Sequence, residues 1–329
     1  MRRLHVGSIG AVLFGMAIAG CSSDEPSAVG SGGSHSGGKS GAGGGGKGGA
    51  DGAVPSGGVA GTAGAAGSAG NAGSGGAVAL TCPPAGRDPA LVRYISPSGG
   101  GNGLSEGAPY QMADFINEAD AGFTGCLLDG VYQGPASMIT HPPRSGSAGN
   151  SCGPSGTGAC DIMVMAMSDG GAFIDGEFVN TPISIQDNSY WTFQGFDVGN
   201  GDGVVFSWST TGAENNNLVF RRICASNNLV TIPGQNGHVW SINYMHNVLF
   251  EDICGFGTGR TTITEAFGSS DLIYRRVWLR FEGNPPTYNG DGVYCHATPI
   301  YQYAYGIVGP VTTENMITVY DPEQYNLAT

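Results

Sequence analysis

The sequence predicts an all-β solenoid, a domain in which short strands stack coil upon coil, and three observations predict it. One eight-residue phrase recurs as WTFQGFDV, LVFRRICA, VLFEDICG and LIYRRVWL. The copies begin at positions 191, 218, 248 and 272, so they lie 27, 30 and 24 residues apart, a period typical of stacked supersecondary units. Each copy is also too short and too rich in strand-forming residues to be a helical repeat.

Like residues occupy like positions of the phrase. The third position holds Phe193, Phe220, Phe250 and Tyr274. The first and sixth positions are apolar in every copy. Such columns are expected when successive coils lie ~4.8 Å apart and each side chain stacks on its counterpart in the next coil. The phrase therefore predicts strands that pair in register from copy to copy.

Elements before, between and after the copies complete the prediction. Residues 112–119 carry apolar side chains at helical spacing and predict a short amphipathic helix. The other segments are expected to be strands. They are 125–132, 161–166, 171–176, 182–185, 203–207, 229–232, 239–242 and, after the pattern weakens at Cys295, 315–319.

The order of these elements resembles a known family. An opening YISPSG at 94–99, the helix, a strand ending in DGVY at 129–132 and a coil ending in IDG at 174–176 are similar to the start of many pectin lyase-like proteins. The resemblance covers most of residues 92–320 and implies a right-handed parallel β-helix whose helix covers the N-terminal end. Such a cover is needed because an open first coil exposes apolar surface and strand edges.

The N-terminal quarter of the chain predicts export rather than a fold. Residues 1–20 contain two arginines followed by an apolar run, as in a signal peptide. Residues 18–21 (IAGC) resemble a bacterial lipobox, which implies lipidation of Cys21; an ordinary cleaved signal is the alternative. Residues 21–80 then form a Gly/Ala/Ser-rich flexible linker, followed by the solenoid domain at 82–329. We expect a protein anchored by lipid to the cell envelope, with the bacterial outer membrane favoured.

The net charge of the predicted solenoid domain argues against some classes of binding partner. Residues 82–329 hold nine arginines against 23 acidic residues, a net charge of −14, and both lysines of the chain lie in the linker. Such a surface repels nucleic acid and anionic membranes. It would also repel a polyanionic glycan unless a cation such as Ca²⁺ bridges the two. We therefore expect a protein that binds no nucleic acid and contacts the membrane only through its lipid. We also expect it to be a monomer.

Seven cysteines remain after Cys21, and an exported protein favours disulfides over metal ligation. Two of them share the seventh position of adjacent copies, where stacking brings Cα atoms within disulfide range. Two others bracket a glycine-rich loop. The candidate pairs are Cys224–Cys254, Cys152–Cys160 and, on weaker grounds, Cys82–Cys126, which leaves Cys295 over.

Fourth and fifth positions of the phrase alternate in charge. The pairs are Arg221-Arg222, Glu251-Asp252 and Arg275-Arg276. The family resemblance implies polysaccharide chemistry, either β-elimination by a base next to a uronate or hydrolysis by paired carboxylates. Arg222 or Arg276 is then the candidate base or carboxylate clamp, with Asp252 supporting Ca²⁺. The alternative is a set of ion pairs between coils, each contributing little.

Further candidate residues lie in loops and aromatic positions. Two NGDG segments place Asp202 and Asp291 as acids or calcium ligands, although such segments also form tight turns. The candidate glycan contacts are Arg260, Arg280, Trp240 and Tyr288, and Trp278 is a further aromatic candidate for stacking on a sugar ring. An aromatic residue in a solenoid is more often part of the core.

The sequence is consistent with two functions. The first is a surface lipoprotein that binds, and under one hypothesis cleaves, an extracellular polysaccharide, with a lyase favoured over a glycoside hydrolase. The second is a non-catalytic adhesion or structural module. The acidic domain, its lack of lysine and the absence of a complete catalytic motif favour the second more than fold analogy does.

Overall fold

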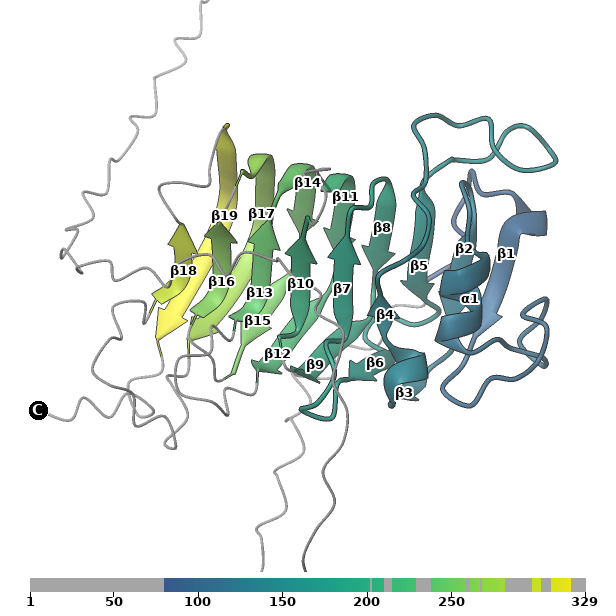
Figure 1. Cartoon of the computed structure of the whole chain (residues 1–329), viewed down its shortest axis with the longest axis horizontal. Coiled ribbons are helices and arrows are strands. Elements are labelled where there is room, and N and C mark those ends of the chain that lie inside the picture. The colour runs from purple at the N-terminus through teal and green to yellow at the C-terminus, as the bar shows by residue number, and fades with distance from the viewer. Residues whose placement is uncertain are drawn as a thin grey trace, which may run out of the picture. The chain divides into compact units, whose positions relative to one another are not determined.

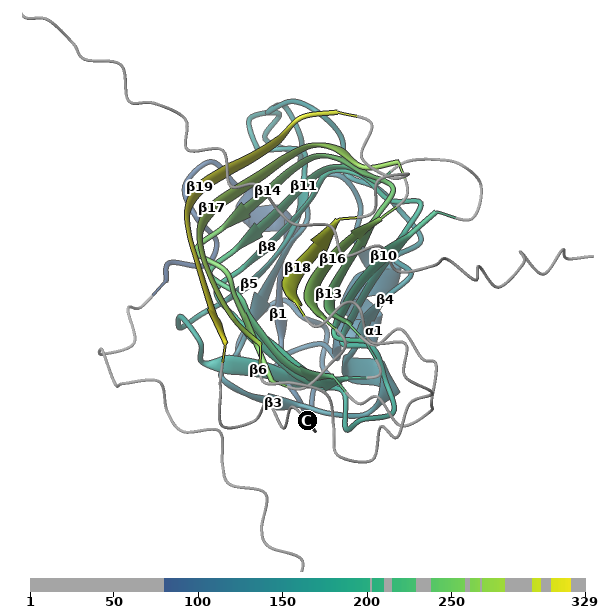
Figure 2. The ribbon, with the colours of Figure 1, turned by 90° about the vertical axis from the view of Figure 1, so that its left-hand side faces the viewer.

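The computed structural model describes most of the chain from Leu80 onward. The described residues are 80–201, 203–209, 215–228, 238–257, 261–266, 268–281, 298–302 and 309–320. They form parallel strands that wind as a right-handed β-helix, which confirms the predicted fold class (Figures 1 and 2). The predicted signal peptide, Cys21 and nearly all of the linker lie outside the described residues.

Each coil contributes strands to three walls. The first wall contains β1 (Val92–Ile95), β2 (Thr124–Leu127), β5 (Ile162–Ala166), β8 (Trp191–Gln194), β11 (Asn215–Arg221) and β14 (Met245–Glu251). The second contains β3 (Gly130–Tyr132), β6 (Ala172–Asp175), β9 (Asp197–Gly201), β12 (Cys224–Asn228) and β15 (Cys254–Phe256). The long strands β17 (Ser270–Phe281) and β19 (Val311–Tyr320) continue from the first wall into the second. The third contains β4 (Ile139–Thr140), β7 (Ile183–Gln186), β10 (Val205–Trp208), β13 (His238–Asn243), β16 (Thr261–Ala266) and β18 (Thr298–Gln302).

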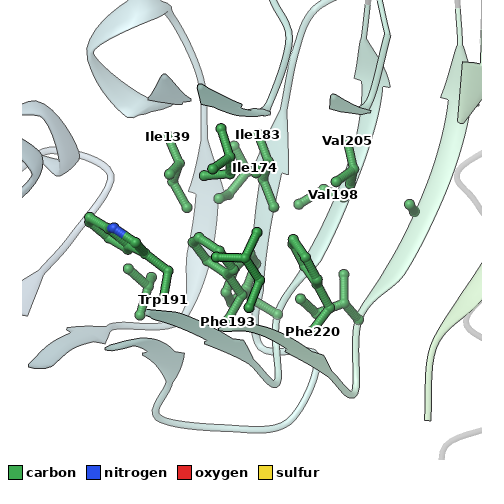
Figure 3. Close-up of a cluster of buried hydrophobic side chains, with 14 of the residues drawn as sticks. Ile139, Ile174, Ile183, Trp191, Phe193, Val198, Val205 and Phe220 are labelled. Atoms are coloured by element: carbon green, nitrogen blue, oxygen red, sulfur yellow. The ribbon is translucent and has the colours of Figure 1, made fainter. Parts of the chain in front are cut away.

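The recurring phrase sets the register of the first two walls. Phe220 pairs with Phe193 in one neighbouring coil and with Phe250 in the other, and Phe250 pairs with Tyr274. Their rings stack with centroids 5.1, 5.3 and 4.8 Å apart. The predicted columns are thereby confirmed. Inward side chains from all three walls fill the space between them, as the cluster around Phe193 and Phe220 shows in Figure 3.

Left-handed backbone turns the chain at each corner. Between the first and second walls, φ is positive at Gly195 (78°), Arg222 (55°), Asp252 (54°), Arg276 (53°) and Asn315 (57°). Asparagines hold the next corner, where φ is positive at Asn200 and Asn227 and the Asn227 amide donates to Asn200 Oδ1 at 3.3 Å. Asparagine is among the residues that tolerate this conformation best. Corner residues therefore stack in columns, as wall residues do.

Helix α1 (Met112–Glu118) covers the N-terminal end of the solenoid, as predicted (Figure 1). Its Met112, Phe115 and Ile116 side chains are buried in the same core as the inward strand residues. Glu118 at its end accepts hydrogen bonds from Arg93 and Tyr110 at 2.6 Å each. Two 3₁₀ turns, at Pro89–Leu91 and Pro135–Ser137, complete the helical elements of the described chain.

The described part of the domain contains three disulfides. They are Cys224–Cys254, Cys152–Cys160 and Cys82–Cys126, with Cα–Cα distances of 4.4, 5.2 and 5.8 Å. All three candidate pairs are thus confirmed, and Cys295 lies outside the described residues. Cys82 belongs to a second, smaller apolar cluster on the outside of the first wall, with Met163 and Met165. Among the described helices, none has the length and apolar character needed to cross a membrane.

Candidate functional site

The alternating charges of the phrase form one connected set of ion pairs. Glu251 lies at its centre, with a carboxylate only 12% exposed. It accepts from Arg221 Nε at 2.6 Å, and Arg275 and Arg276 lie 3.3 and 2.9 Å from its other oxygen. Burial alone would raise the pKa of Glu251, but the hydrogen bonds from Arg221 and Arg276 outweigh it and hold that pKa below its usual value.

Corner geometry separates the second residue of each charged pair from the first. Arg221, Glu251 and Arg275 point outward from the first wall in one register column. Arg222, Asp252 and Arg276 follow them with positive φ and so stand at the corner. There Arg276 binds Asp252 through two hydrogen bonds of 2.5 and 2.8 Å, whereas Arg222 turns the other way and pairs with Asp169 at 3.1 Å.

An open pocket of about 340 Å³ lies at this corner. We name it the corner pocket. Its lining is Asp169, Gly170, Asp197, Arg222, Ile223, Cys224 and Asp252. These residues come from four successive coils, so the pocket runs along the axis of the solenoid. It brings together Arg222 and Asp252, two of the three residues predicted as catalytic.

Two aspartates of the corner pocket have pKa values above the usual value of an aspartate. Burial raises the pKa of Asp197, and the nearby charge of Asp169 adds to the effect, although the Cys224 N–H donates to Asp197 at 3.0 Å. Burial likewise raises the pKa of Asp169, with Asp252 adding and Arg222 opposing. Perturbed carboxyl groups in a pocket are typical of functional sites, although structural ion-pair networks also produce them.

The arginines of the corner differ in what they can do. Hydrogen bonds to Asp252 and Glu251 raise the pKa of Arg276 above its already high value, so this side chain holds its proton and is a poor base. Arg222 lines the corner pocket and its side chain is 30% exposed. Together with the carboxylates, Arg222 offers donors and acceptors to the hydroxyl groups of a ligand.

Beyond the Cys224–Cys254 disulfide, the outside of the second wall becomes aromatic. Trp278 follows Cys254 in the same outward column, and the Phe256 and Trp278 ring centroids lie 6.2 Å apart. Both side chains are partly exposed. The Arg280 guanidinium lies 5.6 Å from the Phe256 centroid and 5.7 Å from the Trp278 centroid, at cation–π distance. We name these three residues the aromatic strip.

Several predicted contact residues lie elsewhere. Trp240, proposed to stack on a sugar ring, is fully buried. Its ring packs edge-on against Phe220 and Phe250, and its N–H donates to the Cys254 carbonyl at 3.3 Å. The prediction that Trp240 contacts a ligand is therefore wrong, because a fully buried ring cannot reach one. Arg280 lies in the aromatic strip, and four others fall outside the described residues. These are Arg260, Tyr288, Asp202 and Asp291.

Sequence reasoning missed Asp169 and Asp197, although a signal for Asp197 was present. It occupies the seventh position of the first copy, the column of Cys224, Cys254 and Trp278. A pair of cysteines that bond across coils in that column already implies an outward-facing position. Asp169 lies in a turn outside the phrase, where no column marks it.

The part of the chain that the structure describes contains no group of three or more His, Cys, Asp or Glu side chains able to hold a metal ion. Asp169, Asp197 and Asp252 line one pocket without forming such a group, and Arg222 supplies the positive charge between them. The candidate calcium ligands Asp202 and Asp291 lie outside the described residues, so calcium binding stays a prediction.

No protein-family model matches the sequence, and no curated protein matches it. Among solved structures, the fold is similar to pectate lyase Pel9A, with 14% identity, a TM-score of 0.38 and coverage of 62% of this chain and 56% of that chain. It is also similar to a rhamnogalacturonan lyase, with 12% identity, a TM-score of 0.39 and coverage of 70% and 62%. The matched part is less than two thirds of either protein. Likeness at this level concerns the fold alone.

Proposed function

We propose that the domain binds an extracellular polysaccharide along the outside of its second wall. The observation that carries this proposal is the alignment of the aromatic strip with the corner pocket on one surface. Trp278 and Phe256 offer partly exposed aromatic surface, beside Arg280, to the apolar face of a sugar, while Arg222 and the three aspartates offer hydrogen bonds to hydroxyl groups. Coils repeat every ~4.8 Å along this surface, a spacing that suits a chain of sugar units lying parallel to the axis.

Binding assays with Trp278→Ala test the proposal. The purified protein is run through gels containing single polysaccharides, and retardation measures affinity. We expect Trp278→Ala to weaken retardation by about tenfold or more, which corresponds to the loss of about 1.4 kcal/mol. Phe178→Ala is the matched control, because Phe178 is an aromatic side chain 41% exposed outside the strip. Equal affinities of the two variants for every retarding glycan would refute this location.

Cleavage by β-elimination is the second candidate, favoured by one observation. Arg222 is partly exposed in the corner pocket beside Asp252, where it could contact a uronate carboxylate. The test follows ultraviolet absorbance of unsaturated products on uronate-containing polysaccharides, with Ca²⁺ and with EDTA. A rise in absorbance that is lost in Arg222→Ala, while this variant is still retarded in the gel, supports a lyase. Retardation of the wild type with no rise in absorbance supports a binding module.

We further infer that the chain is exported and lipid-anchored through Cys21. The apolar run before Cys21 and the linker after it support this inference, and three disulfides suit an oxidising compartment. Growth with labelled palmitate should label the wild-type chain in its bacterial host and leave Cys21→Ser unlabelled. Labelling of neither chain would contradict lipidation.

A further inference from the structure

The three disulfides differ in how far solvent reaches them. Cys224 and Cys254 are both partly exposed, on the outside of the second wall. In each of the other two bridges at least one cysteine is buried, since Cys82, Cys126 and Cys160 are 8%, 0% and 4% exposed. Thiol–disulfide exchange requires a thiolate to reach one of the two sulfurs. Cys224–Cys254 is therefore the described bridge in which both cysteines are open to a thiol in solution.

The corner pocket adjoins this bridge on the side of Cys224. Cys224 is the one cysteine among the described residues that line this pocket of about 340 Å³. In the outward column of the second wall the order is Asp197, Cys224, Cys254 and Trp278, so Trp278 lies beyond the other end of the bridge. A thiolate attacks a disulfide in line with the S–S bond. The pocket therefore directs it to the Cys224 sulfur and makes the Cys254 sulfur the leaving group.

The strands that carry the bridge are also joined without it. β12 and β15 pair in register, and the Cys254 N–H donates to the Ile223 carbonyl at 2.9 Å. On their other sides β12 pairs with β9 and β15 pairs with β17. Opening the bridge gives back to the unfolded chain the freedom that a crosslink removes, but it leaves this backbone pairing in place. We therefore expect reduction to lower stability without unfolding the domain.

We propose that Cys224–Cys254 is a site of thiol–disulfide exchange that takes a small thiol through the corner pocket. The thiolate bonds to Cys224 Sγ, the bond between the two cysteine sulfurs breaks, and the Cys254 thiolate takes a proton from water. A second thiolate then attacks the sulfur of the bound small thiol and releases the Cys224 thiolate. Two small thiols are oxidised to their disulfide as one bridge is reduced. The proposal does not rest on glycan binding.

The charge around the corner pocket selects the kind of thiol. Three aspartates and one arginine line the pocket, and residues 82–329 carry a net charge of −14. An anionic thiol approaching this surface meets repulsion, whereas a cationic thiol is attracted. The class of thiol that fits the site is therefore small and either neutral or cationic.

Timed reduction of the purified full chain with cysteamine, a small cationic thiol, tests the site. Samples are quenched with acid, free thiols are alkylated, and mass spectrometry of peptides assigns the state of each cysteine. We expect Cys224–Cys254 to open at least about tenfold faster than Cys82–Cys126, which is the buried control within the same molecule. The first cysteamine adduct should be on Cys224, and the circular dichroism of the strands should persist after the bridge has opened.

Salt supplies a second measurement. With the anionic thiol 2-mercaptoethanesulfonate, opening should speed up at least about threefold between about 0.01 M and about 1 M NaCl, because the screening length falls from ~30 Å to ~3 Å. Opening by cysteamine should slow over the same range. Equal rates for Cys224–Cys254 and Cys82–Cys126, opening only after urea has unfolded the domain, or a first adduct on Cys254 overturns the proposal. An identical salt response of the two thiols overturns the preference for a neutral or cationic thiol.

Discussion

Asp197 is a residue whose surroundings oppose its charge. Burial first and the charge of Asp169 second raise its pKa above the value in the unfolded chain, so ionisation of Asp197 destabilises the fold at neutral pH. Asp197→Asn keeps an oxygen acceptor for the Cys224 N–H and removes the charge. We expect this variant to be more stable than wild type at pH 7 in urea unfolding. The advantage should shrink as the pH falls through the folded-state pKa and vanish below about 3.9, the usual Asp value. The control is Glu106→Gln, which removes a carboxylate at an exposed position.

Arg222 combines a side chain in the corner pocket with a left-handed backbone. Its φ of 55° is a conformation that glycine adopts freely and that costs other residues roughly 1–2 kcal/mol. Arg222→Ala and Arg222→Gly both lose the ion pair with Asp169, so their difference isolates the backbone. We expect the glycine variant to be the more stable of the two by about 1 kcal/mol in urea unfolding. A more stable alanine variant would show that this corner is not under such strain.

The neighbours of a single residue could be predicted from the sequence where the recurring phrase places like residues at like positions. The charged positions, the aromatic stack and the Cys224–Cys254 disulfide follow from like residues at like positions, because register makes them neighbours. Trp240 lies in a strand outside the phrase, where nothing in the sequence marked its inward direction. Since alternate residues of a strand face opposite sides, an unmarked strand leaves core and surface undecided.

At the level of elements, the stacked rings hold the first wall to the core. Phe220 is fully buried between Phe193 and Phe250, while the preceding residue, Val219, points outward and is partly exposed. We expect Phe220→Ala to cost about 3–5 kcal/mol of unfolding free energy, because it opens a cavity in a continuous stack. Val219→Ala on the same strand should cost clearly less. Urea unfolding followed by tryptophan fluorescence measures both, and similar losses would show that the stack contributes no more than the outer surface.

The elements that the sequence predicted best are those with periodic patterns. Helix α1 and the strands of the four copies carry them, and both lie where expected. The third wall was foreseen only as separate strand-like pieces such as 203–207 and 239–242, which correspond to β10 and β13. The strands of the third wall share no recurring phrase. Their register relative to one another therefore depends on the backbone conformation at the corners, which the amino-acid composition does not predict.

In the described part of the domain, carboxylates of the same chain neutralise much of the positive charge of the arginines. Ion pairs engage six arginines with carboxylates of the same chain, namely Arg87, Arg93, Arg221, Arg222, Arg275 and Arg276. Residues 82–329 nevertheless carry a net charge of −14. The field beyond the surface is therefore negative even though the corner pocket contains an arginine, and a distant anionic polymer meets repulsion before it meets Arg222.

This balance predicts an unusual salt dependence of glycan binding. At about 0.01 M salt the screening length is ~30 Å and repulsion from a polyuronate acts over the whole domain, while near 1 M it falls to ~3 Å. Affinity for any bound polyuronate should therefore rise with NaCl, whereas affinity for a neutral glycan, held by Trp278 and hydrogen bonds, should change little. Gel retardation at both salt concentrations measures the two, with Trp278→Ala as the control for the shared site. Polyuronate binding that weakens as salt is added would mean that local arginines outweigh the field of the domain, and would favour the lyase hypothesis over neutral-glycan binding.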